Sequence, residues 1–378
     1  MFVFTRSKTF YKFVFFQILT LLPFVLIFIY QNQVFVDFYL YYVCLFALLL
    51  VNLSLYYKYV VKLDYIIDQV ANVIAGKPFV PIKIYSPDEF GLLAFFFNDV
   101  TSNLKKISSV IKEEERMSEE LSVAASIQRS VLPKSIPNIP NFDVICKTRP
   151  SEEIGGDSFA VRELNDEYFL YIGDVTGHGA PAGLIMMMVN TLFDVLLSDF
   201  PDCKDIAVNI NHILKPRVNA TMFMTTLFFQ YSPKNKYIEY TGCGHEHIII
   251  YRAEEGVTEV IAAGGIALAM SDDISAIVEK KKINLSKGDV ICLYSDGITE
   301  AMNENGELFG LDHLSDLVKK HAHLNSSIEI FSSISDELSK FTNKTVQIDD
   351  MTLIILKYND TVVENLQDSQ FLTDWNVQ

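Results

Sequence analysis

The stretch Ile154–Gly183 reads IGGDSFAVRELNDEYFLYIGDVTGHGAPAG and contains two Gly-Asp pairs, which end in Asp157 and Asp174. Between them the apolar run Tyr168–Ile172 follows the turn-like residues ELNDE, a pattern that predicts a β-hairpin. Such a hairpin places one aspartate near the end of each strand. Because neighbouring carboxylates repel each other, the pattern indicates a site where a cation lies between them.

Further acidic residues border two other apolar runs. Asp296 follows the segment DVICLYS, and Asp349-Asp350 precedes the segment MTLIILKY. A single aspartate at a strand end is most often a turn or capping residue. Four such positions, two of them beside glycines that permit close backbone approach, instead favour a hard-cation site with oxygen ligands.

Composition narrows the classes of function. The 378 residues leave room for two or three domains, and the net charge of −16 argues against nucleic acid as a partner. The five cysteines are scattered without metal-ligand or redox spacing, which favours reduced thiols in a cytosolic compartment.

The N-terminal part is predicted to be a membrane hairpin over residues 1–57. The runs Tyr11–Tyr30 and Phe38–Tyr57 are almost wholly apolar, and each can span a bilayer core of roughly 30 Å. Lys and Arg flank the pair of runs but are missing from the connecting QNQVFVD, so both ends are predicted to be cytoplasmic. A signal peptide followed by a buried helix is the alternative, but the first run lacks a small-residue cleavage site.

Residues 58–112 have the pattern of two amphipathic helices and a connector. The segment Ser86–Glu89 predicts a capping box with Ser86 as the N-cap. Apolar residues then recur at the spacing of a coiled-coil seam: Phe90, Leu93, Phe97, Val100, Leu104, Ile107 and Ile111. The arrangement, with its DEFG segment, resembles a HAMP signal-relay domain, and an ordinary membrane-proximal coiled coil is the alternative. Either predicts a parallel homodimer.

Residues 113–135 continue as a signalling helix and a proline-containing linker, and residues 136–358 mix strand and helix patterns. Strands are predicted at Val144–Lys147, Phe169–Val175, Met224–Tyr231, Tyr237–Tyr240, His247–Tyr251, Val290–Tyr294 and Thr352–Tyr358, and helices at Ala180–Leu197, Cys203–Val218, Leu311–Lys320 and Ser327–Phe341. We therefore expect an α+β fold with two largely antiparallel sheets flanked by helices. The polar, acidic tail at 359–378 is predicted to be flexible.

Several motifs in this part identify a family. In order they are AxxIQxxxLP, IGGD, GDVTGHGAPA, MTTLFF, GCGH, LxxGDVICLYSDGITEAMNENGELFG and DDMTL. Together they resemble the SpoIIE/RsbU-type serine phosphatases of the metal-dependent (PPM) protein phosphatase family. The resemblance implies an α-β-β-α sandwich that holds two Mn²⁺ or Mg²⁺ ions and hydrolyses phosphoserine or phosphothreonine without a phospho-enzyme.

The resemblance also assigns roles to residues. Asp174 would bridge both metals, Asp157 would bind one of them, and Asp296 and Asp349 would bind the other. The backbone carbonyl of Val175 would be a further ligand. Asp174 and Asp157 are thus the predicted catalytic centre, and no cofactor other than the metals is expected. By resemblance the substrate is a phosphorylated STAS-type anti-anti-sigma factor, and the enzyme would lie at the cytoplasmic membrane with its phosphatase domain in the cytoplasm.

Three features leave alternatives open. His178 in VTGHG is interpreted as a structural hydrogen-bonding residue in a tight turn, with a general-acid role as the alternative. His245-Glu246-His247 is a weak zinc candidate because it offers no third ligand. The segments TGCGH, GGIALAM and Ser158–Ala160 depart from the usual family pattern at positions that the resemblance places near the rim of the site.

Two other classes of function compete with the phosphatase hypothesis. A phosphatase fold kept only as a binding module would be revealed by loss of metal-ligand residues, and the motif positions retain all of them. A class III nucleotide cyclase also uses paired aspartates for two metals. It needs a purine-binding Lys and a transition-state Arg, for which the predicted strands offer no obvious candidates.

Overall fold

The structure, a computed structural model, describes residues 15, 17–22, 25–26, 29, 38–132, 135–200, 202–343 and 345–359. Half of the first predicted membrane span, its connection to the second and the tail from residue 360 onward lie outside the described residues. The chain forms two compact units, Met1–Arg116 and Met117–Gln378.

The first unit is helical over most of its described length. Its elements are α2 (Phe38–Leu55), the π-helical segment η2 (Tyr56–Val60), α3 (Val61–Ile74) and the first part of α4 (Glu89–Val131). The helix predicted over residues 38–57 is confirmed as a helix. Among the described residues, the helical stretch Tyr42–Ile74 is long and apolar enough to cross a membrane.

A small core joins α3, the connector and α4. Ile66, Ile82 and Ala94 are buried together. The Asn98 side chain donates to the backbone carbonyl of Ile82 at 2.9 Å and accepts from the Ile82 backbone N–H at 2.8 Å. One asparagine therefore satisfies both backbone groups of a buried connector residue and fixes the connector against α4.

The start of α4 differs from the predicted capping box. The helix begins at Glu89, and the Asp88 carboxylate accepts from the Gly91 backbone N–H at 3.1 Å. Asp88 is therefore the N-cap, and Ser86 instead donates its hydroxyl to the Asp88 carboxylate. The predicted seam is also divided, because Phe90 and Phe97 pack on the small core of the first unit. Its other members are exposed: Leu93, Val100, Leu104, Ile107 and Ile111.

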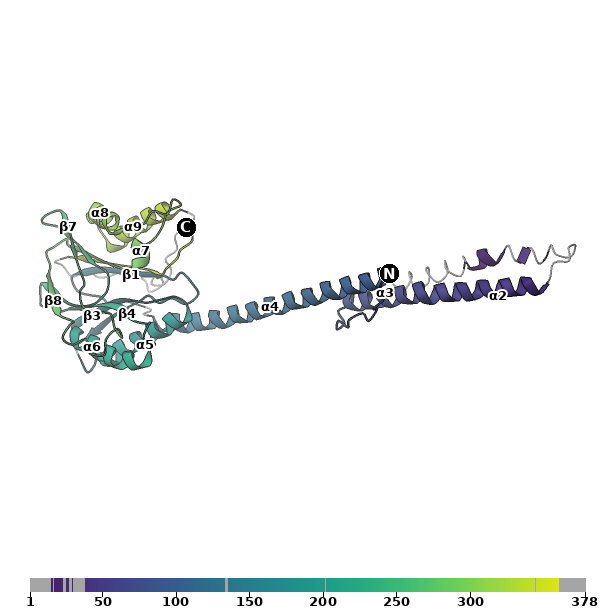
Figure 1. The fold of residues 1–378 in the computed structure, drawn as a ribbon. Helices are drawn as coiled ribbons and strands as arrows, with labels where there is room; N and C mark the ends of the chain where they lie inside the picture. The colour runs from purple at the N-terminus through teal and green to yellow at the C-terminus, as the bar shows by residue number, and fades with distance from the viewer. Residues whose placement is uncertain are drawn as a thin grey trace. The chain divides into compact units, whose positions relative to one another are not determined.

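The second unit is the predicted sandwich of two sheets between two helix layers (Figure 1). One sheet has the order β1-β10-β9-β6-β7 and the other β2-β3-β4-β5-β8, with every neighbouring pair antiparallel. The strands are β1 (Phe142–Arg149), β2 (Ser158–Leu164), β3 (Glu167–Val175), β4 (Met224–Tyr231), β5 (Tyr237–Cys243), β6 (Ile248–Arg252), β7 (Val257–Ile261), β8 (Lys280–Asn284), β9 (Val290–Tyr294) and β10 (Met351–Tyr358). The helices are α5 (Ala180–Leu196), α6 (Cys203–Leu214), η3 (Lys215–Arg217), α7 (Asp296–Thr299), α8 (Leu311–His321) and α9 (Ser327–Thr342).

The predicted hairpin is confirmed as β2 and β3, which pair from Ser158–Gly173 to Leu164–Glu167. Its two-residue turn is Asn165-Asp166, and both residues have positive φ, as a type I′ hairpin turn requires. Alternate residues of β3 face opposite layers, so Tyr171 joins the core under α5 while Ile172 joins the core between the sheets. Because both faces are covered, the strand is a continuous apolar run.

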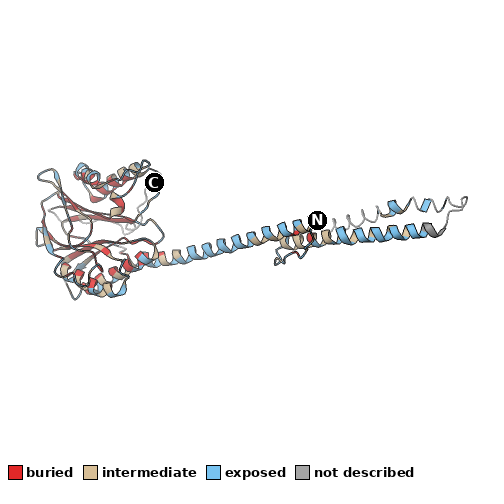
Figure 2. Ribbon diagram, in the orientation of Figure 1, coloured by how far each residue is buried: buried red, intermediate tan, exposed pale blue. Residues whose placement is uncertain are grey.

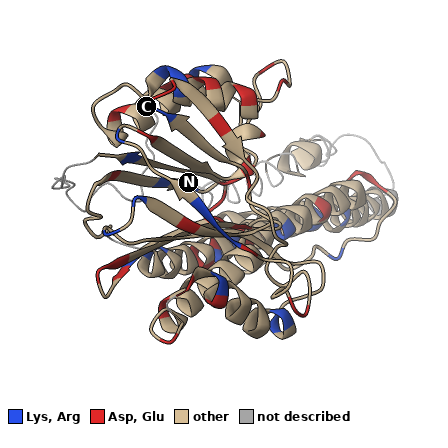
Figure 3. Cartoon of the chain, turned by 90° about the vertical axis from the view of Figure 1, so that its left-hand side faces the viewer, with Lys and Arg blue, Asp and Glu red and all other residues tan. Residues whose placement is uncertain are grey.

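Three hydrophobic cores hold the layers together. One lies between the sheets, one between β2–β5 and the helices α5 and α6, and one between the other sheet and the helices α8 and α9. Figure 2 shows the buried residues gathered between these layers, and Figure 3 shows the same layering from the side, with many acidic residues on helices and loops. The strand ends are left at the margins of the sandwich, where polar side chains can meet.

Two short strands were not predicted, and one helix is shorter than expected. β7 and β8 are largely exposed, so they lack the apolar alternation that identifies a half-buried strand. The helix predicted to reach Val218 ends at Leu214. It is followed by the 3₁₀ turn Lys215–Arg217, where Pro216 cannot donate the backbone hydrogen bond that an α-helix would need.

The aromatic contacts under α5 generate a prediction about stability. The Phe193 ring lies 4.8 Å from that of Tyr171 and 6.0 Å from that of Phe228, fully buried. We expect Phe193→Ala to lower the free energy of unfolding by about 3–5 kcal/mol, because it leaves a cavity in a packed core. Leu184→Ala changes a side chain on the same helix that is 59% exposed, and should cost no more than about 0.5 kcal/mol. Urea denaturation followed by circular dichroism measures both, and equal losses would contradict the assigned core.

Candidate active site

The four predicted aspartates come from both sheets. Asp157 directly precedes β2 and Asp174 is the second-last residue of β3, whereas Asp296 follows β9 as the first residue of α7 and Asp349 precedes β10. β2 and β3 belong to one sheet, and β9 and β10 to the other. The fold thus brings toward one place carboxylates that the sequence separates by up to 192 positions, counted from Asp157 to Asp349.

Each of these carboxyls has a pKa that is raised in part by the charge of another aspartate of the cluster, which indicates that they lie near one another. Burial, followed by the charges of Asp157 and Asp296, raises the pKa of Asp174 to about 10. Burial and the charge of Asp350 raise the pKa of Asp157 to about 7. Burial and the charge of Asp349 raise the pKa of Asp296 to about 6. Each carboxyl is thus harder to ionise because the others are near and water is excluded.

Asp157 is held by hydroxyl groups from the opposite sheet. Its Oδ2 accepts from the Ser295 hydroxyl and from the Thr352 hydroxyl, each at 2.6 Å. Its Oδ1 is also buried, yet has no hydrogen-bond partner among the described residues. A buried carboxylate oxygen without a partner costs free energy, so this atom is suited to bind a cation.

Asp350, the second aspartate of DDMT, binds backbone N–H groups of the loop before β2. Its carboxylate accepts from the backbone N–H groups of Ser151 and Gly156, both at 2.6 Å, and thereby holds the IGGD loop. The fit is close: a Cβ on Gly155 would lie 2.6 Å from the Asp350 carboxylate, and one on Gly297 would lie 2.0 Å from its carbonyl oxygen. A larger residue at Gly155 would push the IGGD loop away from the Asp350 side chain, and one at Gly297 would push α7 away from the backbone that leads into β10.

The last turn of α4 holds the same loop from the other side. The Gln128 side chain is buried, donates to the Gly155 carbonyl at 2.6 Å and accepts from the Gly155 N–H at 3.2 Å. Since Asp157 lies two residues after Gly155, the position of this helix end affects the position of a predicted ligand.

Several of these supporting residues were not predicted as functional. Ser295, Thr352 and Asp350 all lie inside or beside recognised motifs, and Gln128 is the Q of AxxIQ. The motifs therefore marked these positions as part of the pattern. They could not indicate which atoms the side chains bind, because every partner is distant in the sequence.

The histidines near the site have separate roles. The His178 Nδ1 lies 2.7 Å from a Glu152 carboxylate oxygen, and both side chains are largely exposed. His245 is buried, its Nδ1 is 3.0 Å from the Thr225 hydroxyl, and burial lowers its pKa to about 4, so the ring is neutral near pH 7. Thr225 pairs with Asp174 in the β3–β4 ladder, so His245 contacts the strand neighbour of a predicted ligand. The zinc alternative gains no support, because the described residues contain no group of three His, Cys, Asp or Glu side chains that could hold a metal ion.

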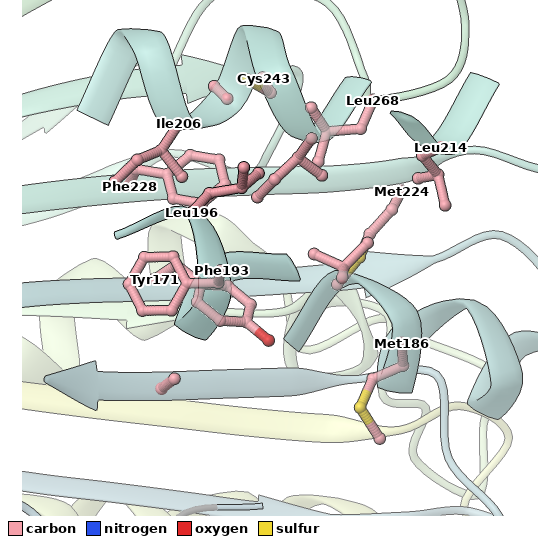
Figure 4. Packing of buried hydrophobic residues seen from close by; sticks show 14 of the residues in the cluster. Tyr171, Met186, Phe193, Leu196, Ile206, Leu214, Met224, Phe228, Cys243 and Leu268 are labelled. Carbon is pink, nitrogen blue, oxygen red and sulfur yellow. The ribbon is translucent and has the colours of Figure 1, made fainter. Parts of the chain in front are cut away.

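Two segments that depart from the family pattern contribute to the core and not only to the rim. Cys243 of TGCGH and Leu268 of GGIALAM are fully buried beside α5 and α6 (Figure 4). The backbones of Leu268 and Met224 exchange hydrogen bonds of 2.8 and 3.1 Å. Cys243 and Leu268 therefore have a packing role, and Leu268 pairs with Met224, the β4 partner of the predicted ligand Val175.

The donor set fits hard divalent cations. The candidates are carboxylate oxygens together with the Val175 carbonyl oxygen, which would lie 3.2 Å from a Cβ built on Gly156. No three His, Cys, Asp or Glu side chains in the described part of the chain are grouped closely enough to hold a metal ion alone. Each ion would complete its shell with water, as Mg²⁺ commonly does when one or two carboxylates bind it.

Comparison with known sequences gives consistent matches. The sequence model of the family described as Stage II sporulation protein E (SpoIIE) matches residues 165–359. Phosphoserine phosphatase RsbU of Bacillus subtilis is 29% identical over 244 residues, which cover 65% of this chain and 71% of RsbU. Protein IcfG of Synechocystis is 24% identical over 300 residues, which cover 72% of this chain and 46% of IcfG.

Solved structures agree on the fold. The SiaA-PP2C domain of Pseudomonas aeruginosa has a TM-score of 0.57 at 19% identity, covering 65% of this chain and 99% of that domain. The RsbU and RsbW domains of a Mycobacterium tuberculosis protein have a TM-score of 0.53 at 22% identity, covering 62% of this chain and 64% of that chain. The α-β-β-α arrangement is therefore the PP2C fold.

The coupled carboxylates generate a prediction about pH. Their pKa values in the folded state are raised, so without a metal the folded state binds more protons than the unfolded state and loses stability as the pH rises from about 4. A cation binds the ionised forms and reverses this effect. Saturating Mn²⁺ should raise the melting temperature by roughly 5–10 °C at pH 8 and by less at pH 6. Differential scanning fluorimetry at both pH values tests this, and equal shifts would contradict it.

Proposed function

The chain belongs to the SpoIIE family, and from this premise we propose that it is a membrane-anchored phosphatase acting on phosphoserine or phosphothreonine in a cytosolic regulatory protein. The family and the PP2C fold make the chain a serine/threonine protein phosphatase. The observation that carries the proposal is that the charges of Asp157, Asp296 and Asp349 all raise the pKa of Asp174. In addition, Asp157 has a buried oxygen without a hydrogen-bond partner among the described residues.

The family is metal-dependent, and we propose that this chain binds two ions. Asp157, Asp174, Asp296, Asp349 and the Val175 carbonyl would hold two Mn²⁺ or Mg²⁺ ions. When bound, these ions would neutralise phosphoryl oxygens and lower the pKa of an attacking water.

The chain itself contributes orientation and burial. The Ser295 and Thr352 hydroxyls fix one oxygen of Asp157 and leave the other free for a cation. The raised pKa values of Asp157 and Asp174 mean that both groups ionise fully near pH 7 only when positive charge is close. The site is thus prepared to bind dications and, through them, a dianionic phosphoryl group.

We further propose that the helices of residues 58–131, here called the stalk, form a parallel homodimer and regulate this site. The exposed apolar residues of α4, among them Leu104, Ile107 and Ile111, have the spacing of a helix–helix seam. The same helix ends in Gln128, whose side chain forms two hydrogen bonds with the loop that carries Asp157. A change in helix packing would therefore alter the metal site. The core of Ile66, Ile82 and Ala94 supports the HAMP-like assignment of the first unit.

The proposed setting is the cytoplasmic membrane, with two spans and the phosphatase domain in the cytoplasm. The apolar helical stretch Tyr42–Ile74 and the charge pattern at the N-terminus support it. The proposed substrate is a phosphorylated STAS-type regulator, because the relative RsbU is named a phosphoserine phosphatase and a structural relative joins RsbU and RsbW domains.

Substitution of the bridging residue tests the reaction. Asp174→Asn should lower phosphate release from a phosphoserine protein by about 100-fold or more, the scale of losing one preorganised electrostatic contact. Asp166→Asn is the matched control, because this residue lies in the hairpin turn at a positive φ that asparagine tolerates. Malachite-green assays of the full chain in detergent with Mn²⁺ measure both variants. If the Asp174→Asn protein remained fully active, the two-metal assignment would be refuted.

Substitution of the helix-end glutamine tests the regulatory link. Gln128→Ala should raise the Mn²⁺ concentration needed for half-maximal activity by about 10-fold, because residues that orient metal ligands typically contribute on that scale. Arg129→Ala changes the exposed next residue and should leave this concentration unchanged. Mn²⁺ titrations of activity compare the two variants. An unchanged titration for Gln128→Ala would exclude the helix end as a determinant of the metal site.

A further inference from the structure

A cleft of about 590 Å³ opens beside the predicted metal site. Its lining includes Asp349, a predicted ligand, and Gly297, which follows the predicted ligand Asp296. The cleft also includes the start of β10, the end of β1 and part of α9. Any phosphorylated chain whose phosphate reaches the metals must therefore place its neighbouring residues near this cleft.

One wall of the cleft is the segment 345–349, which is held in place by hydrogen bonds from two of its own polar side chains. The Thr345 hydroxyl donates to the Met302 carbonyl at 2.7 Å. The Gln347 side-chain amide donates to the Arg149 carbonyl at 2.9 Å and to the Asp349 carbonyl at 2.7 Å. The segment thus has a defined conformation immediately before a predicted ligand.

The residues between these anchors are apolar and exposed. Val346 is 86% exposed and Ile348 is 70% exposed, and both line the cleft. Binding of a partner that covers two large apolar side chains held in solvent is favourable, because it removes their apolar surface from water. A small phosphate ester would not need them, whereas an extended peptide beside its phosphoserine would cover them.

The cleft lining carries both signs of charge: Glu300, Asp336 and Asp349 are acidic, whereas Arg149 and Lys340 are basic, and Lys340 already pairs with Glu337. Arg149, the last residue of β1, lines the cleft, and its guanidinium has no hydrogen bond or ion pair within the described residues. Arg149 lies opposite Met351 in the β1–β10 ladder, and Met351 is two residues after Asp349. In a chain with a net charge of −16, a cation without a partner beside a cluster of carboxylates is suited to an acidic group on a ligand.

We infer that this cleft binds the substrate segment next to the phosphoserine, with Val346 and Ile348 contacting apolar side chains and Arg149 pairing with an acidic one. The inference rests on the proposed phosphatase function and adds to it the chemical class of sequence that is selected. A second copy of this chain is a poorer occupant, because it would cover Asp349 and block the site.

Phosphoserine peptides of 11 residues test the apolar part. One peptide carries leucine two positions before and two positions after the phosphoserine, and its partner carries serine there. The full chain with Mn²⁺ should show a kcat/KM about 10-fold higher for the leucine peptide, and Val346→Ser/Ile348→Ser should reduce this ratio to near one. The pair Val257→Ser/Val260→Ser, at exposed positions on β7 outside the cleft, should keep the ratio.

A second pair of peptides, with glutamate or glutamine beside the phosphoserine, tests Arg149. The wild-type chain should prefer glutamate, and Arg149→Ala should remove that preference while keeping the preference for leucine. Hydrolysis of p-nitrophenyl phosphate by the same preparations measures the activity of the metal site alone. The kcat/KM for each peptide is divided by the kcat/KM for this ester. If the wild type hydrolysed neither this ester nor any peptide, the proposed function would fail. If it hydrolysed the ester but did not discriminate between the peptides, or if the cleft variants kept the preferences, the docking inference alone would be overturned.

Discussion

Repulsion between carboxylates at the ends of strands is the constraint on which the rest of this site depends. Asp157 and Asp174 come from one sheet, and Asp296 and Asp349 from the other. Burial and mutual charge raise their pKa values, so the folded chain holds them together at a cost in free energy. Protons or divalent cations offset that cost. A metal is thus coupled to the stability of the domain as well as to its chemistry.

The IGGD loop is the element through which the surrounding structure acts on this cluster. Asp350 holds the loop from the start of β10, and Gln128 holds it from the end of α4. The opposite sheet supplies the hydroxyls of Ser295 and Thr352 to Asp157. A helix that leads away from the domain therefore shares a hydrogen-bonded loop with a predicted ligand, which provides a direct physical route from stalk to site.

The fold was largely predictable because its strands are covered on both faces. Runs such as Tyr168–Ile172 must be apolar throughout when each alternate residue packs on a different layer. The strands β7 and β8 are largely exposed, so their residues need not be apolar and their sequences do not predict a strand. The N-cap of α4 was assigned to Ser86 instead of Asp88, since either residue can cap a helix and only the backbone path decides between them.

By itself, the sequence determined the family, the layered fold and which acidic residues are candidate ligands, because these follow from local patterns and from motifs along the chain. Only the tertiary structure decided how the ligands are supported. The Ser295 hydroxyl meets Asp157 across 138 positions, and Asp350 turned out to anchor the IGGD loop across 194. Cys243 lies in the core for the same reason. Partners so distant in the sequence are set by the packing of two sheets, which no local pattern encodes.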